Sequence, residues 1–159
     1  MNNIITFDNY NQDIVNLHNI FDNLFLNHKQ NNYYEPVLFN HDFIPEVDTG
    51  FIEYKRTLVN YDVKTDKLLR QIYWRLSESF YYSFNFCYYI IGLDNSGIYS
   101  NINHSDLDAS LQVIIKTIHN RNINLKYIYL FNKNFNSYII ICKLFIDNSM
   151  VNLFIQDML

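Results

Sequence analysis

Glycine is scarce in this sequence, at only 3 of 159 residues. A phosphate-binding loop needs closely spaced glycines, because its backbone N–H groups must approach the phosphates. The glycines stand only at positions 50, 92 and 97, so neither GxxxxGK[ST] nor GxGxxG occurs. The GxSxG and HExxH patterns are absent as well. We therefore expect no GTP binding, no cofactor and no catalytic residue of these classes.

Cysteine and long apolar runs are also rare. Cys87 and Cys142 lie far apart and form no CxxC pattern, so we expect reduced thiols rather than a disulfide framework. The five histidines show no metal-ligand spacing, which predicts no metal site. The longest apolar runs are too short to cross a bilayer, and residues 1–13 lack the features of a signal peptide. These absences favour a cytoplasmic protein that does not enter a membrane.

The charges that are present are unevenly distributed. The net charge of −4 argues against strong nonspecific binding of nucleic acid. Residues 1–48 hold seven acidic side chains and one basic side chain, whereas residues 53–75 hold six basic and three acidic ones. Any contact with a nucleic-acid backbone is therefore expected to be local and to involve the second segment.

Hydrophobic periodicity predicts an α+β domain. Apolar residues at helical spacing indicate helices over 13–27 and 64–80 and a third from Ser105, whose Ser-Asp-Leu-Asp run suggests a capping box. Runs rich in β-branched and aromatic residues indicate strands at 37–39, 51–59, 84–93, 98–102, 125–131, 138–146 and 151–155. We expect a mixed, mostly antiparallel sheet with helices packed on one face. Residues 1–48 would form an N-terminal helix and linker packed on a core of residues 49–159.

The helix over 64–80 has the most informative surface. Its apolar stripe lies on one side, and Trp74 falls on the opposite side with Lys67, Arg70 and Glu78. An aromatic ring among cations suits stacking on an RNA base or anchoring of a protein partner. The alternative is that the N-terminal helix covers this side and buries Trp74. The candidate binding residues are Lys55, Arg56, Lys67, Arg70, Trp74 and Arg75.

In a chain this poor in glycine, the three that remain are expected to be structural. Gly50, Gly92 and Gly97 should hold positions that exclude a side chain. We expect Gly97 to adopt a positive φ or lie in a tight turn, and Gly92 to pass close to another backbone.

Four segments resemble, in order, the N-terminal region of the GTP-binding protein 1 and 2 family of elongation-factor-like translational GTPases. They are GFIEYKRTLVN, LLRQIYWRLSES, YYIIGLDNSGIYSNI and HSDLDASLQVIIKTI, within residues 50–145. In that family the region precedes the GTPase domain, whose first strand would begin about where this chain ends. The resemblance implies a non-catalytic accessory module acting in translation or RNA surveillance. Its implied partners are the ribosome, RNA or a translation-related protein.

IEYK and IIGLDNSG also resemble, more distantly, the AlbA-like core of Schlafen proteins, some of which are metal-dependent RNA nucleases. This second resemblance implies carboxylate ligands at Glu46, Glu53 and Asp94. The residues themselves leave open that Glu53 pairs with a strand lysine and that Asp94 only begins a turn. A third possibility is a structural protein, for example a viral particle component, that reuses the fold.

Overall fold

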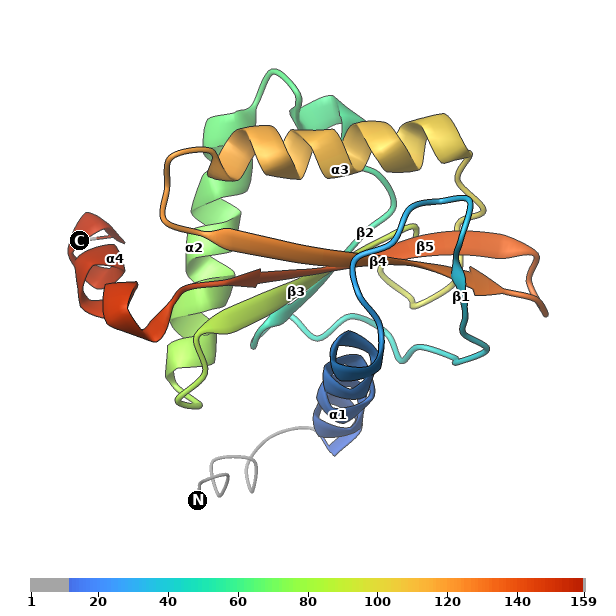
Figure 1. Ribbon diagram of the computed structural model, residues 1–159, viewed down its shortest axis with the longest axis horizontal. Coiled ribbons are helices and arrows are strands. Elements are labelled where there is room, and N and C mark those ends of the chain that lie inside the picture. The colour runs from blue at the N-terminus through green and yellow to red at the C-terminus, as the bar shows by residue number, and fades with distance from the viewer. Residues whose placement is uncertain (1–11, 159) are drawn as a thin grey trace.

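Continuous apolar segments form the centre of the sheet. Every residue of β3 (Phe86–Ile91) is buried, as are most residues of β5 (Ser137–Phe145) beside it. Strands covered on both faces have this composition, because neither side of the pleat meets water. The computed structural model describes residues 12–158 (Figure 1). The remaining elements are α1 (Gln12–Asn27), β1 (Val37–Leu38), β2 (Ile52–Lys55), α2 (Thr65–Phe80), α3 (His104–Ile118), β4 (Asn124–Asn132) and α4 (Val151–Met158), with 3-10 turns at Val59–Tyr61 and Asn148–Met150.

The five strands form one mixed sheet in the order β1-β4-β5-β3-β2. The central pairs, β4–β5 and β3–β5, are antiparallel and are the longest pairings. The edge pairs, β1–β4 and β2–β3, are parallel. The predicted α+β class with a mixed sheet is confirmed. Because β1 pairs with β4, the sheet extends across the predicted boundary at residue 48.

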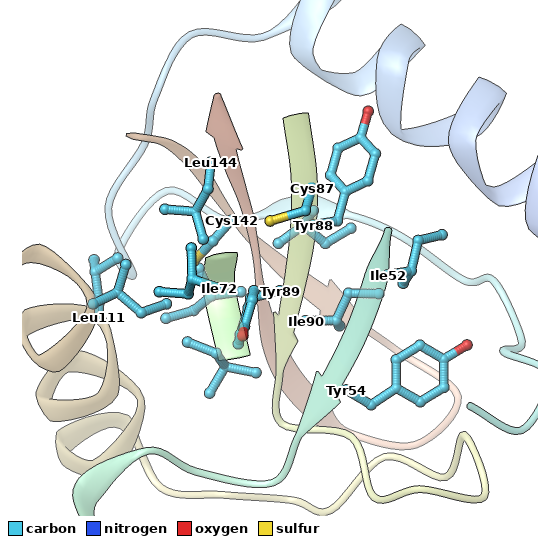
Figure 2. Packing of buried hydrophobic residues seen from close by; sticks show 14 of the residues in the cluster. Ile52, Tyr54, Ile72, Cys87, Tyr88, Tyr89, Ile90, Leu111, Cys142 and Leu144 are labelled. Carbon is cyan, nitrogen blue, oxygen red and sulfur yellow. The ribbon is translucent and has the colours of Figure 1, made fainter. Parts of the chain in front are cut away.

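The helices cover both faces of the sheet rather than one. Tyr88 and Tyr89 are neighbours in β3 and leave the strand on opposite sides (Figure 2). The Tyr88 ring lies 5.0 Å from the ring of Phe21 in α1, whereas the Tyr89 hydroxyl donates to Gln71 in α2. Figure 1 shows α1 and α3 on opposite sides of the sheet. The second face is as apolar as the first, so it also needs a helix to cover it.

The segment predicted as a last strand is a helix. Residues 151–155 belong to α4, which follows the turn Asn148–Met150. Phe154 is fully buried, with its ring 5.2 Å from that of Tyr73 and 6.2 Å from that of Phe80, both in α2. Periodicity alone does not separate a short apolar run in a strand from one in a helix, and here packing against α2 decides.

Two smaller expectations also need correction. Residues 98–102 form no strand; a single antiparallel bridge joins Leu93 and Tyr99. The cap of α3 is Asn103 rather than Ser105, because the Asn103 side chain accepts a hydrogen bond from the backbone N–H of Asp106 at 2.8 Å. The helix therefore begins at His104.

The positive φ predicted for Gly97 and the close backbone approach predicted for Gly92 are confirmed. Gly97 has φ of 86°, and a Cβ there would lie 2.6 Å from the carbonyl oxygens of both Phe43 and Ile44. Gly92 has φ of 105°, and its Cβ would lie 3.0 Å from the carbonyl oxygen of Tyr138. Gly50 also has a positive φ, of 91°. These conformations are strained for any residue with a side chain.

The two cysteines form no disulfide, and the helices are compared with the length needed to cross a membrane. Cys87 and Cys142 are buried and unbonded, and burial raises the pKa of both thiols, so neither is a reactive thiolate. None of the helices within residues 12–158 is both long and apolar enough to span a bilayer. The signal-peptide expectation concerns residues 1–13. Of these, only Gln12 and Asp13 belong to the described part of the chain.

Candidate binding surface on helix α2

Helix α2 has an inner and an outer side. Its inner side is formed by Leu68, Ile72 and Leu76, all fully buried against the sheet and α3. At 100° per residue, Lys67, Arg70 and Trp74 fall within one narrow arc on the outer side. The spacing that drives the inner residues into the core therefore directs these three towards solvent.

Trp74 is open to solvent, with 43% of its surface exposed. The guanidinium carbon of Arg75 lies 4.8 Å from the centre of its ring. Helix α1, which might have covered this side, instead packs on the opposite face of the sheet. The open arrangement of Trp74 is thus the one the chain adopts.

Apart from Arg75, the cations near Trp74 have no acidic partner within the described residues. Lys67 and Arg70 are exposed, and so are Arg56 and Lys64 nearby in the sequence. No carboxylate oxygen of residues 12–158 comes within ion-pair distance of these four side chains. Lys64 and Lys67 also line a hollow of about 210 Å³ at the start of α2. We call Lys64, Lys67, Arg70 and Trp74 the α2 surface.

Three of the predicted binding residues are not part of this surface: Arg56 is exposed but lies outside α2, whereas Arg75 and Lys55 are held inside the fold. Arg75 is only 2% exposed, and its guanidinium donates to Glu53 at 2.8 Å and to the Gly50 carbonyl at 2.9 Å. Lys55 is largely buried, 3.5 Å from Glu53, with its ammonium 5.2 Å from the centre of the Tyr61 ring. Both cations are engaged inside the fold, so neither is available to a ligand.

The structure brings together two of the three candidate carboxylates. Glu46 lies along the free edge of β2, where its Oε2 accepts a hydrogen bond from the Tyr54 backbone N–H at 2.5 Å. Arg75 reaches both carboxylates, at 2.8 Å to Glu53 and 3.9 Å to Glu46. Glu46 therefore replaces the missing strand partner of β2, and Arg75 compensates the charge of the pair.

Asp94 does not join these carboxylates. Its Oδ1 accepts hydrogen bonds from the backbone N–H groups of Ser96 and Ile98 and from the Ser96 hydroxyl. These bonds, chiefly the one from the Ser96 hydroxyl, lower the pKa of Asp94. Within residues 12–158 no three His, Cys, Asp or Glu side chains are grouped so that they can hold a metal ion. Asp94 closes its own turn, as one of the two sequence interpretations expects.

Glu46 makes the stability of the fold depend on pH. Burial, together with the nearby Glu53, raises the pKa of Glu46 to about 7. Since the folded chain binds this proton more tightly than the unfolded chain, Glu46 stabilises the fold below the ordinary glutamate pKa. That contribution, at most about 3 kcal/mol, is lost as the pH rises through 7.

Urea unfolding at pH 5 and pH 8 tests this expectation. The wild type should lose more stability between these pH values than Glu46→Gln, whose amide oxygen still accepts from Tyr54. Glu35→Gln, at an exposed acid, should keep the wild-type pH dependence. Equal losses in the wild type and Glu46→Gln would show that Glu46 is ionised throughout this range.

A second polar cluster, which was not expected from the sequence, lies at the start of α3. His104 and Asp108 face each other one turn apart, with His104 Nε2 3.2 Å from an Asp108 carboxylate oxygen. The other carboxylate oxygen accepts a hydrogen bond from the Tyr129 hydroxyl. The i,i+4 spacing of His104 and Asp108 is visible in the sequence, but the approach of Tyr129 depends on the packing of α3 on β4.

Comparison with known proteins adds no relative. No protein-family model matches the chain, and no curated protein matches it. The resemblances to translational GTPases and to Schlafen proteins therefore rest on the residues quoted for them.

Proposed function

We propose that this protein is a non-catalytic binding module that contacts single-stranded RNA through the α2 surface. The observation that supports the proposal most strongly is the solvent-exposed Trp74 on the same side of α2 as Lys67 and Arg70. Any of the bases can stack on such a ring, while the cations neutralise the neighbouring phosphates. The module would therefore bind RNA with little sequence preference.

The charge distribution is compatible with a local contact of this kind. Of the acidic side chains near the α2 surface in sequence, Asp62 is paired with Lys116 at 3.2 Å and Glu78 accepts a hydrogen bond from the Gly50 N–H. Asp66, in the first turn of α2, is exposed and lies one turn before Arg70. The acidic residues of α1 lie on the other face of the sheet. The α2 surface thus carries three exposed cations against the Asp66 carboxylate, in a chain whose net charge is −4. Because Coulomb interactions between exposed charges are screened within about 10 Å, binding should be sensitive to salt.

The resemblance to the region before the GTPase domain supplies the biological setting of the proposal. We infer an accessory role in translation or RNA surveillance, in which the module brings RNA or the ribosome to a separately supplied activity. The closeness of Glu46 and Glu53 favours the alternative of a Schlafen-like nuclease. The position of Asp94, which bonds within its own turn, argues against it as a third ligand. We therefore favour binding over cleavage.

Binding of a short single-stranded RNA, followed by fluorescence polarisation, tests the proposal. Trp74→Ala should weaken binding about tenfold or more, because one base–aromatic stack contributes about 1–3 kcal/mol. Lys67→Ala should lower the slope of log K against log salt by about 0.7. Lys67→Ala should leave the melting temperature unchanged, since Lys67 is exposed. Trp74→Ala should lower the free energy of unfolding by about 1 kcal/mol, since it removes the ring from the Arg75 guanidinium, so binding is compared well below both melting temperatures.

Lys116→Ala provides a matched control, because Lys116 is an exposed lysine whose ammonium already pairs with Asp62. It should leave RNA binding unchanged. Wild-type binding that survives Trp74→Ala and Lys67→Ala together would overturn the proposal. If purified ribosomal or translation proteins bind at Trp74 while RNA does not, the α2 surface is instead a protein-docking site.

A further inference from the structure

A pocket of about 340 Å³ lies between the first turns of α3, strand β4 and the turn at residues 31–35. The turn is fixed to the strand by Asn31, whose side chain accepts from the Tyr129 N–H at 2.7 Å and donates to the Tyr129 carbonyl at 3.4 Å. The same Asn31 amide donates to the Glu35 carbonyl at 2.7 Å. Asn31 thus bonds to β4 at Tyr129, one residue before the part of β4 that pairs with β1. This contact holds Tyr33 and Tyr34 over the pocket.

Aromatic rings form the walls of this pocket. The ring of Tyr33 is perpendicular to those of Tyr34 and Tyr129, at centroid distances of 5.6 and 6.2 Å. Tyr127 is likewise perpendicular to Tyr129 at 6.2 Å, and His104 packs against Tyr33 at 3.6 Å. Several of these contacts are edge to face, and the electron-rich faces of tyrosine rings attract cations.

The charge in the pocket is negative. Asp108 is the acidic residue among those lining it, its side chain is 49% exposed, and no lysine or arginine lines it. His104 Nδ1 is buried and has no hydrogen-bond partner within the described residues. Among the described residues, no lysine or arginine lies within ion-pair distance of the Asp108 carboxylate.

We propose that this pocket, which we call the tyrosine cage, binds the N-methylated ammonium group of a modified lysine side chain in a partner protein. Tyrosine faces and one carboxylate suit such a group, because methylation spreads the positive charge over a larger and less hydrated surface. An unmodified lysine is more strongly hydrated and gains less from entering. A nucleotide or a phosphocholine headgroup would bring a phosphate towards Asp108, which disfavours both.

The cage can be tested with small probes by calorimetry, and by NMR of the aromatic side chains. Tetramethylammonium chloride and N-acetyl-trimethyl-lysine amide should bind saturably to the full chain, whereas sodium chloride at the same ionic strength should not. The corresponding unmodified lysine amide should bind at least about tenfold more weakly. Phosphocholine should bind more weakly than choline, because its phosphate is repelled by Asp108.

Tyr34→Ala and Asp108→Asn should each weaken binding of the trimethyl-lysine probe about tenfold or more. Tyr34 is 80% exposed, so its removal should leave the fold intact. Tyr81→Ala is the matched control, since Tyr81 is 81% exposed and lies at the end of α2. The proposal is overturned if the probes do not bind, if both cage variants bind as the wild type does, or if adenosine monophosphate binds and Asp108→Asn strengthens it.

Discussion

Arg75→Met should lower the free energy of unfolding by about 3–5 kcal/mol, the usual cost of removing one partner of a buried ion pair. The substitution leaves Glu53, only 6% exposed, without its hydrogen bond at 2.8 Å. It also removes the donor to the Gly50 carbonyl, at the turn that leads into β2. Lys55 compensates the charge of the unpaired Glu53 only in part. Its ammonium lies 3.5 Å from the carboxylate, a longer distance than that of Arg75, and it also contacts the Tyr61 hydroxyl. Urea unfolding measures the loss.

Two further variants distinguish the ion pair from a general effect of changing α2. Arg70→Met alters an exposed arginine in the same helix and should change stability by less than about 0.5 kcal/mol. Adding Glu53→Gln to Arg75→Met should recover part of the loss, because the buried carboxylate is then gone. A cost below about 1 kcal/mol for Arg75→Met would contradict the role assigned to Arg75.

Gly97→Val should cost more than about 3 kcal/mol, because backbone strain and steric clash add. At φ of 86° a β-branched residue is strained, and its Cβ would meet two carbonyl oxygens at 2.6 Å. Those carbonyls belong to the segment that ends at Glu46, whose N–H donates to the Asn95 carbonyl at 2.8 Å. The substitution therefore separates this segment from the turn as well as straining Gly97.

Thermal unfolding compares Gly97→Val with Asn95→Ala, a change in the same turn that removes an exposed side chain but keeps the backbone bonds. Asn95→Ala should stay within about 0.5 kcal/mol of the wild type. If both variants have the melting temperature of the wild type, the turn is free to rearrange. The close approach of Gly97 to the Phe43 and Ile44 carbonyls is then not required for stability.

Much of the fold could be predicted from local pattern. The apolar stripe of α2 keeps a helical period over the whole helix, and the run of β3 is marked as a strand by its aromatic and β-branched residues. The scarcity of glycine indicated Gly92 and Gly97 because few other residues tolerate a positive φ. These features depend on the residue itself or on near neighbours, so the sequence contains them.

Features decided by distant packing could not be read in the same way. Arg75 lies at the border between the two sides of α2, and only the approach of Glu53 and Gly50 turns its long side chain inward. Residues 151–155 are helical because Phe154 meets α2. The tyrosine cage needs Asn31 to reach Tyr129, 98 positions away. No local signal marks such contacts.

Trp74 is the only tryptophan of the chain, so its emission reports directly whether this ring contacts single-stranded RNA. Titrating RNA while exciting tryptophan selectively over tyrosine follows this one ring. We expect saturable quenching that weakens as salt rises and is reduced in Arg70→Ala, since stacking and phosphate neutralisation act together. RNA binding detected by polarisation with no change in Trp74 emission would contradict it, because the RNA would then be bound elsewhere.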